Sequence, residues 1–127
     1  MNSPQALKLI EQLKKQVAVQ DLKDETITTI SDQLMKIREI SMIEKNPTVT
    51  KSLRLASEHI KENQSFLVKI PFDSQDEQET ESEDRSIYSD SYDSESLSYF
   101  LSLIESSEKK VNLLEIKEYN KAFLDFN

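Results

Sequence analysis

The chain has 127 residues, enough for one domain with a single core, and it contains no glycine and no cysteine. Without glycine, the phosphate-binding loops of nucleotide enzymes and the tight hairpins of all-β folds are excluded. Without cysteine, disulfides, thiolate metal sites and cysteine nucleophiles are excluded too. These exclusions favour an all-α, non-enzymatic protein that needs no cofactor.

The net charge of −8 is unevenly distributed. Residues 1–70 carry 11 Lys/Arg and 9 Asp/Glu, residues 71–108 carry 1 and 12, and residues 109–127 carry 4 and 3. The acidic balance disfavours direct nucleic-acid binding. No apolar run is long enough to span a membrane and no secretory signal is visible, so we expect an intracellular protein with no membrane partner.

Three helices are predicted in the N-terminal half. Ser3-Pro4 is a helix-start signal, and the segment it opens reaches Val17 with apolar residues at helical spacing. A second helix begins near Asp21 or Asp24 and ends between residues 41 and 45. Asn46-Pro47 repeats the start signal for a third helix that ends near residue 63.

The remaining residues are predicted to form a tail, a linker and a C-terminal helical segment. Residues 66–72 are apolar except for Lys69, too few for a helix and without an obvious partner strand, so we expect an extended tail on the bundle. Residues 73–95 are rich in Ser, Asp and Glu, which predicts a disordered linker. Residues 96–127 predict one or two helices. The predicted domains are therefore residues 1–72, 73–95 and 96–127. The turns between the helices are expected to need no residue with positive φ.

His59 is the only histidine. One histidine without a recognisable nucleophile or carboxylate partner does not indicate a general base. We therefore interpret His59 as a partly exposed structural residue.

The linker carries several candidate sites. Asp90, Asp93 and Glu95 lack the spacing and the glycine turn of a calcium loop, so no metal site is predicted. Ser74 and Thr80 are followed by acids as acidophilic kinases require, which makes both hypothetical phosphorylation sites. Among the nearby aromatic residues, we expect Tyr88 and Tyr92 to be exposed and Tyr99 and Phe100 to be core.

One family resemblance spans residues 17–38 and 55–63. These stretches resemble the helical domain at the N-terminus of transcription elongation factor TFIIS and the related integrase-binding domain of lens epithelium-derived growth factor. Thr28 stands where that family usually has glycine, and Asn63 where it commonly has tryptophan. The matching positions are Leu22, Thr26, Ile27, Ile30, Leu34, Lys36, Leu55, Ala56 and Ile60.

The resemblance implies a nuclear bundle that binds short segments of acidic residues next to phenylalanines. Otherwise we expect a cytoplasmic protein. The leading hypothesis is a protein–protein interaction module, a small subunit or adaptor of a larger complex, with a transcription-related hetero-oligomer as the candidate assembly. In the alternative, the acidic segment binds histones or other basic proteins, or mimics nucleic acid. The partner-binding residues are predicted to be Ile27, Ile30, Leu34, Ile37, Tyr99, Phe100, Leu101, Phe123 and Phe126.

Overall fold

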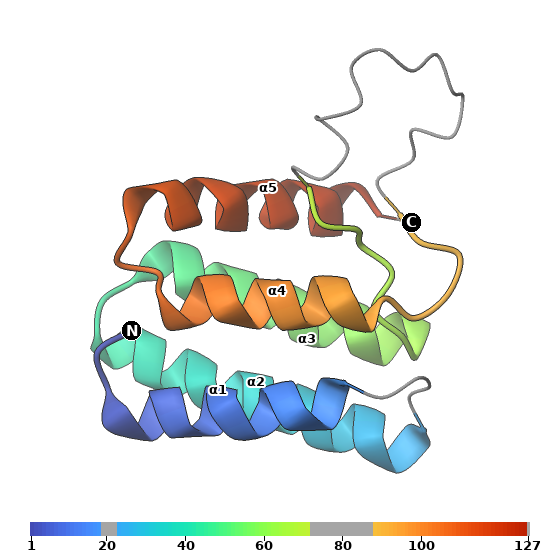
Figure 1. The fold of residues 1–127 in the computed structure, drawn as a ribbon, viewed down its shortest axis with the longest axis horizontal. Coiled ribbons are helices and arrows are strands. Elements are labelled where there is room, and N and C mark those ends of the chain that lie inside the picture. The colour runs from blue at the N-terminus through green and yellow to red at the C-terminus, as the bar shows by residue number, and fades with distance from the viewer. Residues whose placement is uncertain (19–22, 72–87, 127) are drawn as a thin grey trace.

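The fold is all-α, as the sequence predicts, and the boundaries of the first three helices agree closely with the expected ones (Figure 1). The computed structural model describes residues 1–18, 23–71 and 88–126. These residues form five helices: α1 (Pro4–Val17), α2 (Asp24–Ile43), α3 (Pro47–Asn63), α4 (Ser94–Glu105) and α5 (Lys110–Asp125).

Three of the five helices begin with a side-chain cap. The Ser3 hydroxyl accepts a hydrogen bond from the Ala6 amide at 3.3 Å, and the Asn46 side chain accepts one from the Val49 amide at 3.4 Å. The Asp93 carboxylate accepts one from the Ser96 amide at 3.0 Å. Each bond satisfies an N–H that the first helical turn cannot pair internally. The first two caps are the predicted ones.

The helices pack in two layers around one core. Figure 1 shows α1, α4 and α5 side by side in front of α2 and α3. The closest helix pairs are α1 with α2 and α4, α3 with α2 and α5, and α4 with α5. Every helix therefore touches two neighbours in a closed ring, and residues of the N-terminal and C-terminal halves share a single hydrophobic cluster.

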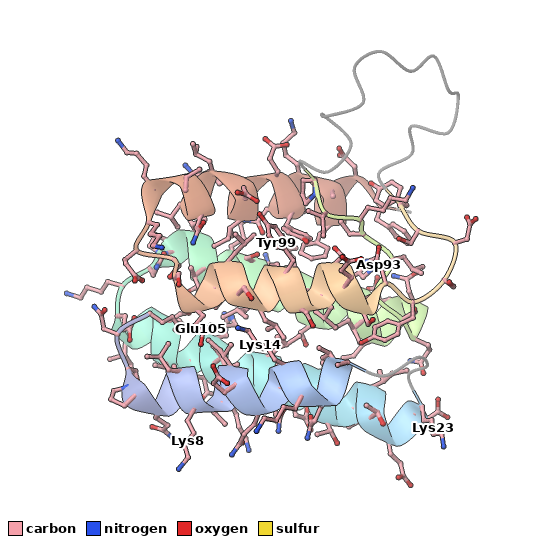
Figure 2. The ribbon with its side chains drawn as sticks, viewed as in Figure 1. Lys8, Lys14, Lys23, Asp93, Tyr99 and Glu105 are labelled. Atoms are coloured by element: carbon pink, nitrogen blue, oxygen red, sulfur yellow. The ribbon has the colours of Figure 1, made fainter. Side chains whose placement is uncertain are left out.

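Polar contacts join the chain's first residues to the C-terminal half. The Met1 amine donates hydrogen bonds to the Glu105 carbonyl at 3.2 Å and to the Ser107 hydroxyl at 3.3 Å. On α1, Lys14 forms a salt bridge of 2.7 Å with the Glu105 carboxylate, and the two side chains point toward each other in Figure 2. These bonds hold α1 against the end of α4.

The apolar segment after α3 lies extended on the bundle, as expected, with Phe66 and Val68 buried. It does find a partner: Val68 forms an isolated antiparallel bridge with Tyr88. The Ser89 amide donates to the Leu67 carbonyl at 2.7 Å, and the Asp93 amide donates to the Phe66 carbonyl at 2.9 Å. Residues 88–93 therefore form the outer edge of this extended segment.

The expectation that Tyr88 and Tyr92 are exposed is wrong, because both rings are half-buried against the core. The Tyr92 hydroxyl donates to the Val17 carbonyl at 2.5 Å, and the Tyr88 hydroxyl donates to the Ala122 carbonyl at 3.0 Å. These two carbonyls lie in the last turns of α1 and α5. A carbonyl in the last turn has no hydrogen-bond partner within its own helix. The tyrosines therefore serve as caps from the loop before α4.

The expectation that the helix breaks need no positive φ is also wrong. Lys45, between α2 and α3, has φ of 59°, and Gln64, directly after α3, has φ of 55°. Both conformations are left-handed, the region that glycine enters most readily. In a chain without glycine, these turns are made by residues with a Cβ atom.

Candidate binding face

Most of the residues predicted to bind a partner form the chain's own core. The buried ones come from α2, α4 and α5, whereas Tyr99 and Phe126 are half-buried. No partner can reach the buried side chains while the bundle is folded, because their apolar surface is already covered by neighbouring helices. The buried residues of this set are Ile27, Ile30, Leu34, Ile37, Phe100, Leu101 and Phe123.

His59 is structural, but it is buried rather than partly exposed, with 5% of its surface accessible. Its ring lies 5.6 Å from the ring of Phe66, 5.5 Å from that of Phe123 and 4.7 Å from that of Phe126. The Leu67 amide donates a 3.0 Å hydrogen bond to Nε2, which places the proton of the neutral imidazole on Nδ1. Burial lowers the pKa of His59 to about 4.

The candidate sites of the acidic segment are only partly visible. Ser74 and Thr80 lie outside the described residues, as do residues 73–87 of the predicted linker. Asp90 and Glu95 are exposed. Asp93 caps α4 with one carboxylate oxygen and accepts a 2.7 Å hydrogen bond from the Ser89 hydroxyl with the other. This carboxylate therefore has a structural role.

A hollow of about 760 Å³ opens on the surface where α2 meets α3. Four cationic side chains line it: Arg38 from α2, Lys45 from the turn, and Lys51 and Arg54 from α3. Met42, which is among the exposed large hydrophobic residues, adds an apolar wall. Of the four cations, Arg54 has a carboxylate partner, Glu58, at 3.3 Å one turn away.

A second hollow, of about 410 Å³, lies between the start of α3 and the second half of α5. Lys117, Lys121 and the exposed Leu124 form its α5 side. Pro47 and Lys51 line both hollows, so the two lie next to each other at the first turns of α3. We call the combined surface the cationic face; its six cations are Arg38, Lys45, Lys51, Arg54, Lys117 and Lys121.

The charge of the cationic face is opposite to that of the whole chain. Among the described residues that line the two hollows there is no aspartate or glutamate. Six of the chain's 16 Lys/Arg therefore gather on one face of a protein with net charge −8. Sequence reasoning missed this face because its cations come from three helices and one turn. Only the near-neutral balance of residues 1–70 hinted at basic residues that the fold could collect.

Two polar atoms on the cationic face have no hydrogen-bond partner within the described part of the chain. They are Arg38 Nε and Asn120 Oδ1, two buried atoms that belong to residues lining the larger and the smaller hollow. Asn120 itself is 7% exposed. The hydroxyl of Ser52, which follows the lining residue Lys51, is likewise buried without a partner. Buried polar groups are nearly always paired, so atoms of this kind call for an explanation.

Comparisons with known proteins leave the chain without an identified relative: no family model, curated protein or solved structure matches it. The resemblance to the TFIIS domain therefore stays a prediction. Within residues 1–18, 23–71 and 88–126, no helix is long and apolar enough to cross a membrane. The same residues contain no cluster of three or more metal-ligating side chains.

Proposed function

We propose that the protein is a non-enzymatic interaction module, a subunit or adaptor, that binds an acidic segment of a partner protein on its cationic face. The observation that carries this proposal is the gathering of six cations around two adjacent hollows. Among these six, Arg54 is the one that forms an ion pair within the described part of the chain. Like charges repel one another. An anionic occupant would relieve that repulsion.

A protein segment fits this surface better than a nucleic acid does. The apolar residues of the hollows, Met42, Pro47 and Leu124, suit aliphatic side chains. None of the described lining residues has an aromatic ring on which nucleic-acid bases could stack. A long polyanion would also meet the chain's net charge of −8 beyond the hollows, whereas a short acidic segment would not.

The resemblance to the TFIIS N-terminal domain also supports this proposal, because it implies that the bundle binds acidic segments. In this chain, however, most of the predicted binding residues are core. The proposal therefore rests on the surface cations and would stand without the resemblance.

Charge reversal tests the proposal. A fluorescent glutamate-rich peptide is titrated into the full chain, into Lys51→Glu/Lys121→Glu, and into the control Lys8→Glu/Lys15→Glu. Both variants change the net charge equally, and Lys8 and Lys15 are exposed on α1, where Figure 2 shows Lys8 pointing away from α4 and α5. We expect roughly tenfold weaker binding for the first variant and little change for the control. Equal effects, or tighter binding of a uridine homopolymer, would overturn the proposal.

The chain's own acidic residues require one further control. Residues 73–84 carry seven carboxylates and can compete for the cationic face in a titration. The experiment is therefore repeated with a variant in which these residues are replaced by asparagine and glutamine. If neither form of the chain binds the peptide, the proposal is wrong.

The natural partner can be identified with a photo-crosslinking amino acid placed at Leu124. The matched control is Leu114, because both leucines are exposed on α5, at 58% and 53%, but only Leu124 lines a hollow. We expect a partner protein to cross-link to position 124 and not to position 114. The cross-linked peptide of the partner should be rich in Asp and Glu. Cross-linked peptides without an excess of acidic residues would contradict the proposal.

A further inference from the structure

The two hollows of the cationic face differ in the kind of cation that lines them. All cations of the smaller hollow are lysines: Lys117 and Lys121 from α5, and Lys51 from α3. The larger hollow adds two arginines from neighbouring helices, Arg38 from α2 and Arg54 from α3. A lysine ammonium is a point charge, whereas a guanidinium is a planar fork that donates two parallel hydrogen bonds to an oxyanion. The larger hollow is therefore the better site for a group with several anionic oxygens.

One neutral residue of the larger hollow adds a further donor. The Asn46 side chain accepts from the Val49 amide with its oxygen, which leaves its NH₂ group as the part that can bind a ligand. The hydroxyl of Thr50, another lining residue, lies 2.6 Å from that of Ser41 and is already paired. Together with the four cations, the Asn46 NH₂ group makes this hollow rich in donors.

Arg54 is held by an ion pair that a ligand can displace. Its Nη1 donates to the two oxygens of Glu58 at 3.4 Å and 3.3 Å. Both side chains are exposed, at 42% and 54%, and an exposed pair of this kind contributes little to stability. A ligand with more than one negative charge can replace Glu58 or share the guanidinium with it.

The number of cations in the larger hollow matches a doubly charged group. Four cations surround a volume of about 760 Å³. One carboxylate brings a single charge and two oxygens, whereas a phosphate monoester brings a charge of about −1.5 to −2 and three strong acceptor oxygens. A phosphorylated lipid headgroup would have the same chemistry, but it would bring a chain of net charge −8 to an anionic membrane surface. A phosphorylated peptide carries no such penalty.

We propose that the larger hollow binds a phosphoserine of the acidic segment, while Lys117 and Lys121 in the smaller hollow bind its carboxylates. This inference rests on the proposed function and adds to it the modification that the partner carries. Kinases that require acidic residues beside the acceptor place a phosphate and carboxylates in one short segment. Phosphorylation of the partner would therefore strengthen its binding to this chain.

Three peptides test the ligand. The first is glutamate-rich with one central serine, and the second carries phosphoserine at that position. In the third, glutamate replaces the serine and one neighbouring glutamine, so that its charge matches that of the second. We expect the full chain to bind the phosphoserine peptide roughly tenfold more tightly than the serine peptide, and the third peptide only about twofold more tightly. Equal gains for the second and third peptides would show that charge alone decides, and would overturn the inference.

Two matched variants test the place of binding. Lys45→Gln/Arg54→Gln removes two cations from the larger hollow, and Lys117→Gln/Lys121→Gln removes two from the smaller one. The three lysines are exposed and the Arg54 side chain is 42% accessible, so neither variant should disturb the core. The first variant should keep a gain from phosphorylation of no more than about threefold. The second should keep the tenfold gain while it binds every peptide more weakly. A gain that falls equally in both variants would contradict a phosphate site in the larger hollow.

The outcomes separate this inference from the proposed function. If the charge-reversal variant weakens binding of the glutamate-rich peptide but phosphoserine adds no affinity, the inference is wrong and the proposed function stands. If none of the peptides binds, the proposed function fails as well. Tighter binding to vesicles that contain a phosphoinositide than to the phosphoserine peptide would assign the hollow to a lipid headgroup and overturn the inference. Thermal unfolding of each variant checks that the fold is retained.

Discussion

The amide of Leu67 donates a hydrogen bond to Nε2 of His59, which joins the extended segment after α3 to the last turns of that helix. An imidazole that accepts at Nε2 must be unprotonated there. Three phenylalanine rings surround it and exclude water. Protonation would place two donors against each other and leave a charge in an apolar site, which is the physical reason for the low pKa.

This geometry predicts a loss of stability in acid. The pKa of His59 falls from 6.5 to about 4 on folding, so below pH 6.5 the unfolded chain binds a proton that the folded chain does not. The free energy of unfolding should therefore decrease as pH falls through this window. The histidine contribution reaches about 3 kcal/mol below pH 4, at roughly 1.4 kcal/mol for each pH unit. Urea unfolding at a series of pH values measures it.

His59→Gln provides the control, because glutamine can still accept from Leu67 but does not titrate. The variant should be less stable at neutral pH, since it lacks the ring contacts. Between pH 7 and pH 4, the free energy of unfolding of the variant should nevertheless fall less than that of the unaltered chain. In the variant, only the carboxylates make stability depend on pH in this range. Parallel curves for the two proteins would show that His59 is not the origin of the pH dependence.

A second prediction concerns Ser31 and Ser57, whose buried hydroxyl oxygens lie 2.5 Å apart between α2 and α3. Ser57→Ala should cost about 1–2 kcal/mol, because it leaves the Ser31 hydroxyl buried without this partner. Ser31→Ala should cost less, since the Ser57 hydroxyl keeps the Ser31 carbonyl at 3.4 Å. The double variant should be more stable than Ser57→Ala alone, and additive losses in chemical unfolding would contradict the pairing.

The helices themselves were predictable from local signals. Ser3-Pro4 and Asn46-Pro47 mark helix starts because a capping side chain and a fixed φ act within one turn, independently of the rest of the fold. The apolar spacing then indicates which face becomes buried. The same spacing identified the core of α2, but it cannot distinguish a residue that packs inside the chain from one that packs on a partner.

What could not be predicted depends on contacts between residues distant in sequence. Tyr92 and Val17 are separated by 75 positions, so no local pattern shows that a tyrosine in an acidic run will cap α1. The cationic face has the same origin, since Lys51 and Lys121 become neighbours only when α3 packs on α5. The prediction for His59 was wrong because the rings that cover it come from the segment after α3 and from the end of α5, and the latter is more than 60 positions away in the sequence.

The tyrosine caps give a third prediction, which hydrogen exchange can test. Tyr92→Phe removes the donor to the Val17 carbonyl, and Tyr88→Phe removes the donor to the Ala122 carbonyl. Each should destabilise the chain by about 1 kcal/mol. Amide exchange should become faster in the last turn of α1 for Tyr92→Phe and in the last turn of α5 for Tyr88→Phe. Each variant serves as the control for the other. Identical exchange patterns would contradict separate capping roles.

The last prediction follows from the left-handed turn between α2 and α3. Lys45 is exposed and has φ of 59°, a conformation that costs a residue with a Cβ roughly 1–2 kcal/mol. Lys45→Gly removes this strain but increases the freedom of the unfolded chain, so a net stabilisation of about 0.5–1 kcal/mol is expected. The matched control is Lys51→Gly, since Lys51 is also exposed but lies inside α3, where glycine should cost about 1 kcal/mol. Urea midpoints that shift in opposite directions with an unchanged slope would confirm that backbone conformation, rather than the loss of a lysine, decides the effect.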